Sequence, residues 1–349
     1  MFTDEIAEQS DALRALVQFY RSEAGAELLE RCATLPGADE AVTFTGMGSS
    51  LYSSYAVLPA LWAGQRWAAS FEAGEILHYG LPGWRPHGPL VAVSQSGESA
   101  ETLALARRLV GVAPLIAVTN EPDSGLAQIA QVTLPMHAGI ESAISTKTYT
   151  NTLGVLHLLT ASLLGNDLSG IFTALESSAA AMDTALSPDL ESAIADAAAL
   201  IDEISSVHFI GRGPSLSATY VGALTIGEGA RVTAVGLPAA SFRHGPMELA
   251  GDGHAAILFM PDGPTRPLME KLRNDLERVH TRTVTISHQK SEALPEGALE
   301  IGTESGVNEE AFFPFPAAII VERILAEVAK RRHITPGDFR YGGKVTAEE

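Results

Sequence analysis

The chain has 349 residues, of which 46% are hydrophobic, and its formal net charge is −19. At roughly 100–200 residues per domain, this length predicts two domains, each large enough to bury an apolar core. So acidic a surface repels nucleic acid and anionic membranes. The chain has a single cysteine, Cys32, which excludes a disulfide framework and a cysteine-based metal cluster.

The first 33 residues are predicted to form a helical lead-in. They begin MFTDEIAEQS, which is acidic and lacks the basic and apolar regions of a signal peptide. The longest apolar run in the chain, LGVLHLLTASLLG at 153–165, is too short to cross a bilayer. We therefore expect a cytoplasmic protein with no membrane partner.

Strand-like and helix-like segments alternate after the lead-in. This alternation predicts a parallel sheet with helices on both of its faces. We expect strands at 41–46, 89–94 and 114–119, and helices at 49–64, 99–110 and 147–165.

The same order then starts again. TGMGSS, which follows the first strand, returns 165 residues later as IGRGPS, again after an apolar strand and before a helix. Two copies of one domain are therefore predicted, in the α/β class, each a doubly wound, flavodoxin-like parallel sheet. The second copy contains strands at 255–260 and 282–287 and a helix at 312–331. We expect domains at 34–168 and 190–335, a helical join at about 166–190, and a polar tail at 336–349.

The stretch VAVSQSGESAETLALARRLV passes from a strand through a small polar loop into a helix. Ligands of parallel sheets bind beyond the carboxyl ends of strands, where helix N-termini attract anions. Ser94, Ser96 and Ser99 offer hydroxyl donors in this loop, which we call the serine loop. Ser49 and Ser50 are placed to close the cup from a neighbouring strand. The pattern predicts an anion site, and the alternative is that the serines only cap helices.

The second copy has PDGPT where the first has the serine loop. Its prolines remove amide donors and its aspartate repels anions, so we expect one anion site per chain, in the first copy. Neither GxxxxGK[ST] nor GxGxxG is present, which argues against a nucleotide. No spacing of His, Asp or Glu is typical of a metal site, and we expect neither metal nor cofactor.

Several motifs in the chain resemble a known family. GMGSS, SQSGESAET and GIESAISTKTYT are similar to the sugar isomerase (SIS) fold. FRHGP and the C-terminal YGGKVTAEE resemble the isomerase half of the glutamine–fructose-6-phosphate aminotransferases. They also resemble stand-alone relatives, the SIS-type glucosamine-6-phosphate deaminases and the fructosamine-6-phosphate deglycases. The resemblance runs from about residue 40 to the C-terminus.

The resemblance implies that the serine loop binds a sugar phosphate. Gln95 would contact a sugar hydroxyl, and Ser145 would be either a ligand or an N-cap. The other substrate contacts that it implies are Gly48, Ser49, Ser50, Ser94, Ser96 and Ser99.

The resemblance also implies three catalytic residues. Glu228 would move a proton between C1 and C2 of the sugar. His244 would help to open the sugar ring and, in a homodimer, would reach into the partner subunit's site. Lys344 would form an imine with the ketose carbonyl.

The chemistry of these residues fits such roles. Glu228 is flanked by glycines on a weakly polar helix, so it is a plausible buried carboxylate whose pKa is raised towards neutrality, although it could be a surface glutamate. His244 precedes Gly-Pro, which forms a turn that can present the ring to a cleft. Lys344 could attack a carbonyl only if a closed site lowered its pKa, and a tail lysine is otherwise exposed. Glu141 and Lys147 are expected to order the loop before the long helix.

The chain departs from the aminotransferase pattern. We expect no glutaminase domain, because the chain begins MFTDE, and Thr225 and Ser241 stand where the family commonly has a lysine and an acidic residue. We therefore expect conversion of glucosamine 6-phosphate to fructose 6-phosphate and ammonia. The alternatives are a fructosamine-6-phosphate deglycase, a synthase subunit that receives ammonia from a separate glutaminase, and a non-catalytic phosphosugar sensor.

Overall fold

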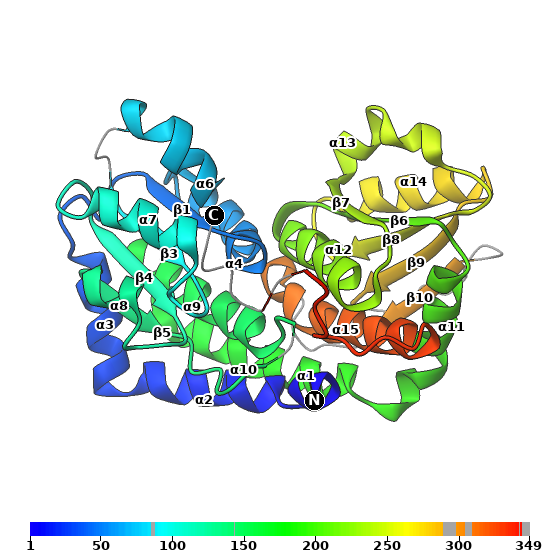
Figure 1. The fold of residues 1–349 in the computed structure, drawn as a ribbon, viewed down its shortest axis with the longest axis horizontal. Coiled ribbons are helices and arrows are strands. Elements are labelled where there is room, and N and C mark those ends of the chain that lie inside the picture. The colour runs from blue at the N-terminus through cyan, green and yellow to red at the C-terminus, as the bar shows by residue number, and fades with distance from the viewer. Residues whose placement is uncertain (85–87, 143, 289–297, 304–308, 342, 344–349) are drawn as a thin grey trace. The chain divides into compact units, whose positions relative to one another are not determined.

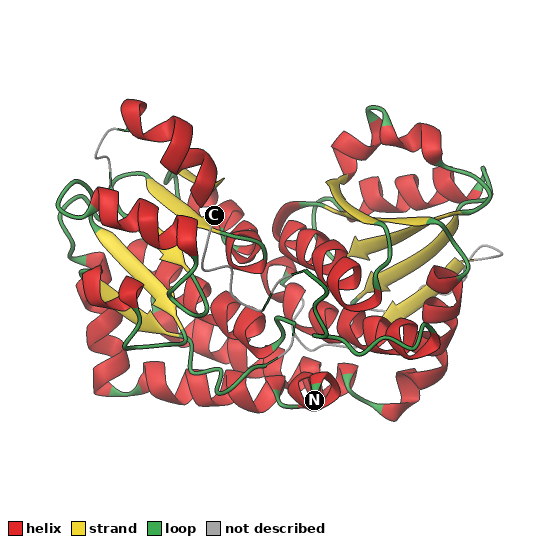
Figure 2. Cartoon of the chain, in the orientation of Figure 1, coloured by secondary structure: helices red, strands yellow, loops and turns green. Residues whose placement is uncertain are grey.

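The computed structural model describes all residues except 85–87, 143, 289–297, 304–308, 342 and 344–349. The chain forms two compact units, and each contains one five-stranded parallel sheet (Figures 1 and 2). Unit 1 consists of the described residues of 1–10, 142–146 and 177–339, and unit 2 of those of 11–141, 147–176 and beyond 339. The first helix therefore belongs to the same unit as the C-terminal half of the chain.

The sheet of unit 2 has the strand order β2-β1-β3-β4-β5, and every neighbouring pair is parallel. Its inner strands are short apolar runs that are buried on both faces, as expected where helices cover a parallel sheet on both sides. In the register, Thr43 lies opposite Ala69 on one side and Leu90 on the other. The strands are β1 (Val42–Gly46), β2 (Ala68–Glu72), β3 (Leu90–Val93), β4 (Leu115–Thr119) and β5 (Val132–Pro135).

Helices cover both faces of this sheet (Figure 1). On one face, Leu90 and Leu115 pack with Leu103, Leu105 and neighbouring apolar residues. Helix α9 is buried along nearly its whole length, which explains its apolar sequence. The helices of the unit are α2 (Gln9–Arg21), α3 (Glu23–Ala33), α4 (Ser49–Ser53), α5 (Leu58–Ala63), α6 (Ala73–Glu75), α7 (Ala100–Leu109), α8 (Gly125–Ile129), α9 (Lys147–Leu163) and the first half of α10 (Leu168–Ala185).

The sheet of unit 1 has the strand order β10-β9-β8-β6-β7, again parallel throughout. Read from the other edge, this order is β7-β6-β8-β9-β10, which matches the first sheet strand for strand. Thus β6 corresponds to β1, and β8 corresponds to β3. The strands are β6 (Ser206–Gly211), β7 (Ala234–Pro238), β8 (His254–Met260), β9 (Arg282–Ser287) and β10 (Ala298–Gly302).

Unit 1 also has helices on both faces of its sheet (Figure 2). Phe242, Met269 and Leu272 pack against alternate residues of β8 on one face. On the other face, α12 contacts α15 and β6. The helices are α1 (Phe2–Ala7), α11 (Glu191–Asp202), α12 (Leu216–Ala230), α13 (Ala239–Arg243), α14 (Arg266–Glu277) and α15 (Pro314–Arg331). The prediction of two doubly wound domains is confirmed.

The prediction of one continuous helix over 49–64 is wrong. The chain forms α4, a 3-10 turn at Ser54–Ala56, and then α5. Pro59 lies in the first turn of α5 and has no amide donor, so it begins a new helix rather than continuing the previous one. Four strands at the edges of the sheets were also missed. One of them, β2, is half exposed, and its polar ending hides the apolar pattern of a strand.

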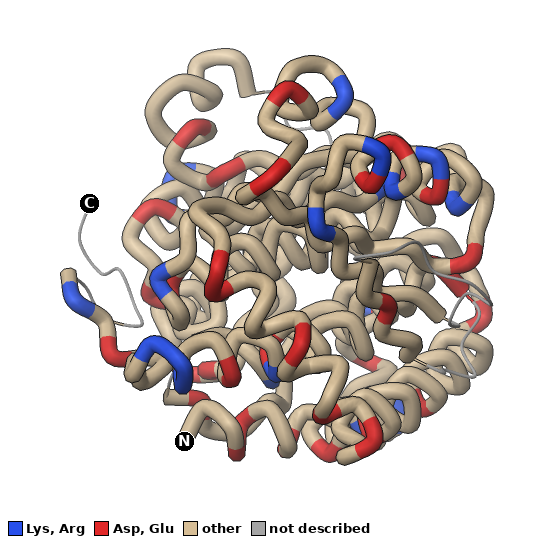
Figure 3. Tube along the Cα trace, turned by 90° about the vertical axis from the view of Figure 1, so that its right-hand side faces the viewer, with Lys and Arg blue, Asp and Glu red and all other residues tan. Residues whose placement is uncertain are grey.

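The acidic residues are spread over many helices and loops and lie among fewer basic ones (Figure 3). In the part of the chain that the structure describes, no helix is both long and apolar enough to span a membrane.

Candidate functional site

The serine loop lies at the switch point of the first sheet. The chain passes from β1 outward to β2 and then to β3 on the other side of β1, so the strand order reverses between β1 and β3. Crevices at such points are the usual ligand sites of open parallel sheets. The two strand ends are close together, because a side chain at Gly46 would come within 2.7 Å of the Val93 carbonyl oxygen. The serine loop after β3 and the Gly48–Ser50 turn after β1 therefore share one edge.

Hydroxyl groups organise the serine loop from within. Ser94 is buried, and its Oγ lies 3.0 Å from Ser99 Oγ and accepts a hydrogen bond from the Gly97 amide at 3.1 Å. Ser96 Oγ accepts from the Glu98 amide at 3.2 Å. Gln95, Ser96 and Ser99 are each partly open to solvent. An incoming anion can therefore reach several hydroxyls on a loop that is already ordered.

The geometry argues against the N-cap alternative for Ser99. Ser99 is the N-cap residue of α7, yet its side chain makes no capping hydrogen bond and pairs with Ser94 instead. The Ser124 side chain, by contrast, does cap α8 by accepting from the Ala127 amide. The first amides of a helix have no partner within the helix, so those of α7 remain available to an anion. Gly48, the N-cap of α4, has no side chain to offer and adopts a φ of 52°.

A third loop braces the serine loop, and sequence reasoning missed it. After β4, Thr119 Oγ1 donates to the Gln95 carbonyl oxygen at 3.1 Å. The Glu98 carboxylate accepts from the Gly125 amide at the start of α8. Gly97 has a φ of +66°, and a Cβ on it would lie 2.0 Å from Ser124 Oγ, so only glycine fits. The run TNEPDS, small and polar directly after a strand, was the signal that could have found this loop.

Glu141 and Lys147 order the start of the long helix α9, as the sequence suggested. The Glu141 carboxylate accepts from the Thr148 amide at 3.0 Å and from the Thr148 hydroxyl at 2.7 Å. Lys147 Nζ donates to the Ile140 carbonyl oxygen at 2.8 Å. Ser145 belongs to unit 1, whereas the serine loop belongs to unit 2, and its role as a substrate contact or an N-cap stays a prediction.

Glu228 lies in the last turn of α12, and the expectation that it is buried is wrong. Its side chain is exposed, while the neighbouring Gly229 is buried so tightly that a Cβ on it would lie 2.6 Å from Ile144. The glycines that suggested a buried carboxylate therefore serve helix packing instead. Surrounding protein nevertheless desolvates the Glu228 carboxyl and raises its pKa above the ordinary value, which suits a general base.

His244 follows directly after α13 and is exposed. The turn that presents it is held by a hydrogen bond from the His244 amide to the Ser241 carbonyl oxygen at 3.1 Å and continues through Gly245, whose φ is +143°. The guanidinium of Arg243 is bound to Asp275 at 2.9 Å, which leaves His244 as the outward-facing group of the turn. Lys344 lies outside the described residues.

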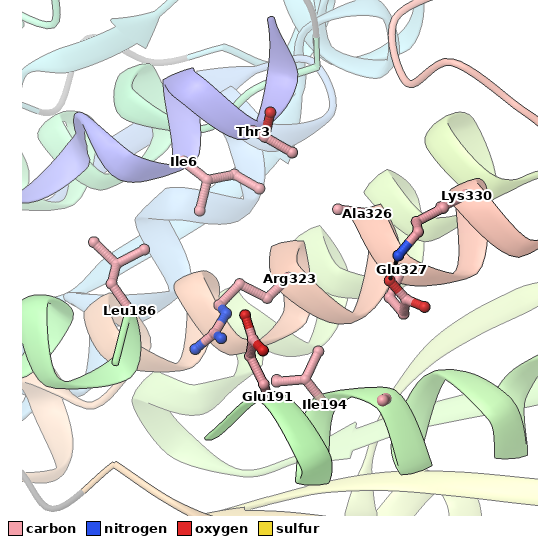
Figure 4. Close-up of a pocket in the computed structure, with 10 residues that line it drawn as sticks. Thr3, Ile6, Leu186, Glu191, Ile194, Arg323, Ala326, Glu327 and Lys330 are labelled. Atoms are coloured by element: carbon pink, nitrogen blue, oxygen red, sulfur yellow. Dashed lines mark hydrogen bonds and ion pairs between the residues drawn. The ribbon is translucent and has the colours of Figure 1, made fainter. Parts of the chain in front are cut away.

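Unit 1 also contains a cavity of about 610 Å³ between α1, α11 and α15 (Figure 4). Apolar side chains such as Ile6 and Ile194 form much of its wall. Three of its four charged side chains are already engaged, because Lys330 pairs with Glu327 at 3.1 Å and Arg323 donates to two backbone carbonyls. None of the predicted site residues lines it. The described residues contain no group of three or more His, Cys, Asp or Glu side chains placed to hold a metal ion.

Comparison with known sequences supports the two-copy reading. The model of the SIS domain family matches residues 39–162 and 200–321. A glutamine–fructose-6-phosphate aminotransferase from Zymomonas mobilis is 31% identical over 261 residues, which are 71% of this chain and 42% of that protein. The corresponding protein of Pyrococcus horikoshii is 34% identical over 55% of this chain and 32% of its own length. The chain thus spans less than half the length of these relatives.

Solved structures share the fold. The C-terminal domain of the glucosamine–fructose-6-phosphate aminotransferase from Francisella tularensis superposes with a TM-score of 0.85 at 19% identity, covering 96% of this chain and 97% of that one. Glucosamine-6-phosphate deaminase from Thermotoga maritima gives 0.75 at 21% identity, covering 99% and 98%. Tagatose-6-phosphate ketose/aldose isomerase from Escherichia coli gives 0.79 at 17% identity, covering 97% and 94%. With both of its sheets matched by the family model, the chain belongs to the SIS domain family.

Proposed function

We propose that the protein is a phosphosugar aldose–ketose isomerase that converts glucosamine 6-phosphate and water into fructose 6-phosphate and ammonia. The observation that carries this proposal is the serine loop, an ordered set of hydroxyls beside unpaired helix amides at a sheet switch point. The names of similar proteins, a glutamine–fructose-6-phosphate aminotransferase and a glucosamine-6-phosphate deaminase, support this choice of substrate.

In this proposal, the serine loop binds the phosphate end of the sugar. Hydroxyls and helix amides can neutralise a phosphate without lysine or arginine, which suits a chain of net charge −19. Ser96 and Ser99 are open enough to donate to phosphate oxygens, while the buried Ser94 holds Ser99 in place. Gln95 contacts a sugar hydroxyl.

The chemical step is a proton shift between two adjacent carbons. The Glu228 carboxylate removes the proton from C2 of the open-chain amino sugar, which leaves an enolamine as the C1 oxygen takes up a proton. Glu228 then returns its proton to C1, and the amino group loses one proton as the C2 imine forms. The C2 imine that results is hydrolysed by water, which becomes the ketone oxygen as ammonia leaves. A carboxyl with a raised pKa is a stronger base than an ordinary one and is matched better to this transfer. Lys344 is included in this proposal because of the family resemblance alone, as the amine that forms an imine with the ketose carbonyl.

In this proposal the protein is a homodimer, and His244 of one subunit opens the sugar ring that is bound in the site of the other subunit. Its exposure after α13 is compatible with a role outside its own subunit. Mixing inactive His244→Ala and Glu228→Gln subunits tests this. A shared site restores activity in one of the two sites of each mixed dimer, about a quarter of the wild-type rate for random 1:1 assembly. Sites built from one chain restore none.

A substrate panel tests the function itself. The purified protein is incubated with glucosamine 6-phosphate, with unphosphorylated glucosamine and with a fructosamine 6-phosphate, and the sugar product and free amine are quantified. Release of fructose 6-phosphate and ammonia from the first substrate alone supports the proposal. Turnover only of the third substrate indicates a deglycase, and tight binding without any turnover indicates a sensor.

A further inference from the structure

The second sheet has its own switch point, and a side chain of the chain itself occupies it. β6 and β8 correspond to β1 and β3, so the crevice between the loops after β6 and β8 is the counterpart of the serine-loop crevice. Gly213 follows β6 and Gly263 follows β8. A Cβ on Gly213 would lie 3.2 Å from Glu310 Oε1, and one on Gly263 would lie 2.9 Å from Glu310 Oε2. The Glu310 carboxyl thus touches the loops on both sides of the switch point.

Glu310 is also held there by a specific contact. The Thr265 side chain, at the start of α14, forms a hydrogen bond with its carboxyl group. The carboxyl is half-buried, and burial raises its pKa. Two glycines, one hydroxyl and one carboxyl group therefore fill a position where a doubly wound sheet would otherwise hold a ligand.

The remaining groups at this edge could serve an anion if the carboxyl were absent. Ser215, in the turn before α12, is fully buried, and its Oγ has no hydrogen-bond partner among the described residues. Thr265 would be released from Glu310. Arg266, beside the loop after β8, is already shared, because it binds Asp262 at 2.6 Å and Glu270 at 2.9 Å. Arg212, directly before Gly213, has a buried Nε atom with no hydrogen-bond partner among the described residues.

We propose that Glu310 is a built-in occupant of the second switch point and excludes phosphate-class anions from the second copy. An oxygen pair against Gly213 and Gly263 has the shape and position of a bound anion, so the carboxyl takes the space that a phosphate would need. This gives a second cause, beside the sequence PDGPT, for one anion site per chain. The inference rests on the proposed function only in taking the first copy as the phosphate-binding one.

Counting bound phosphate tests the inference. Equilibrium dialysis with labelled inorganic phosphate gives the number bound per chain for wild type, Glu310→Ala and Glu310→Ser, with Glu309→Ala as the matched control at an exposed neighbour. We expect each Glu310 variant to bind one phosphate more per chain than wild type and the control. Equal numbers in all four proteins, with their circular dichroism spectra unchanged, would overturn the inference.

The test compares the number of phosphates bound per chain between each variant and the wild type, and the wild-type number itself does not decide the outcome. A rise from zero to one supports the inference even if the serine loop binds no phosphate, so the two proposals fail separately. Hydrogen exchange on the wild type gives an answer even if both variants misfold. Phosphate should leave amide exchange at Gly213, Ser215 and Leu216 unchanged while Glu310 is present, and protection there would overturn the proposed exclusion.

Discussion

The Oγ atoms of Ser94 and Ser99 lie 3.0 Å apart, although Ser99 stands at the N-cap of α7 and could have capped the helix instead. Because the two hydroxyls pair with each other, the Ser99 side chain does not bind the first amides of α7. The Ser99 hydroxyl and these amides both remain available to a ligand. This pairing distinguishes an anion-binding loop from a helix N-terminus that is capped by its own serine.

Replacing Ser99 with Ala should weaken substrate binding with little loss of stability. No capping bond is lost, and Ser94 keeps its bond from the Gly97 amide. Ser124→Ala is the matched comparison, because that side chain does cap a helix, and its loss should lower the free energy of unfolding by about 0.5–2 kcal/mol. Urea unfolding and the KM for glucosamine 6-phosphate measure the two effects. A stability loss at Ser99 as large as that at Ser124 would return Ser99 to the role of a cap.

Replacing Ser96 with Ala should raise KM and leave kcat nearly unchanged. A hydroxyl that donates to a charged phosphate contributes about 1.5–3 kcal/mol, so KM should rise about 10- to 100-fold. Ser192→Ala, at an exposed position of α11, is the control and should leave both constants unchanged. If Ser96→Ala has the wild-type KM, the serine loop does not bind the phosphate.

Replacing Gly97 with Ala should disrupt the serine loop by collision. Both Gly97 and Gly111 have positive φ angles, +66° and +74°, but a Cβ at Gly97 meets Ser124 Oγ at 2.0 Å and one at Gly111 meets nothing within 4 Å. Gly111→Ala thus measures backbone strain alone, about 1–2 kcal/mol. Gly97→Ala should lower the free energy of unfolding further and reduce sugar phosphate binding. Equal losses for the two variants would show that Ser124 moves away freely.

Replacing Glu228 with Gln should lower kcat by about 10²- to 10⁴-fold, as expected for loss of a general base, with a small change in KM. In the wild type, kcat/KM should fall as the pH drops through the pKa of Glu228, because the base must be ionised, and the raised pKa moves this fall above the range of an ordinary carboxyl. Glu309→Gln is the control. A pH profile of Glu228→Gln that retains the acidic fall would assign it to another group.

The buried pair His208 and His254 should make unit 1 sensitive to acid. His208 Nδ1 lies 2.9 Å from His254 Nε2, and burial together with the neighbouring ring lowers the pKa of His208 to about 4. Between about pH 6.5 and 4 the unfolded chain binds the proton and the folded one does not, so stability falls as the pH falls through this window. Urea midpoints across this range should decline less in His208→Gln than in wild type. His280→Asn, an exposed position with a φ of 61° that Asn tolerates, should follow wild type.

The sequence was sufficient to predict the two-sheet architecture because the inner strands are apolar runs and the polar loops repeat after equivalent strands. Prediction from the sequence failed where contacts with residues far away in the chain determine the position of a side chain. Glycines beside Glu228 suggested a buried carboxylate, yet Gly229 is small because Ile144 packs on it. Two other features depend on strand order, which no local sequence pattern encodes. They are the close contact of Ser124 with Gly97 and the position of Glu310 between two loops.

Whether the protein is a deaminating isomerase is best decided by the conversion of glucosamine 6-phosphate by the wild-type protein and by Glu228→Gln, with fructose 6-phosphate and ammonia measured together. We expect equal amounts of both products from the wild type and a rate lower by at least about 10²-fold in the variant. Ammonia release no greater from the wild type than from Glu228→Gln would contradict this expectation.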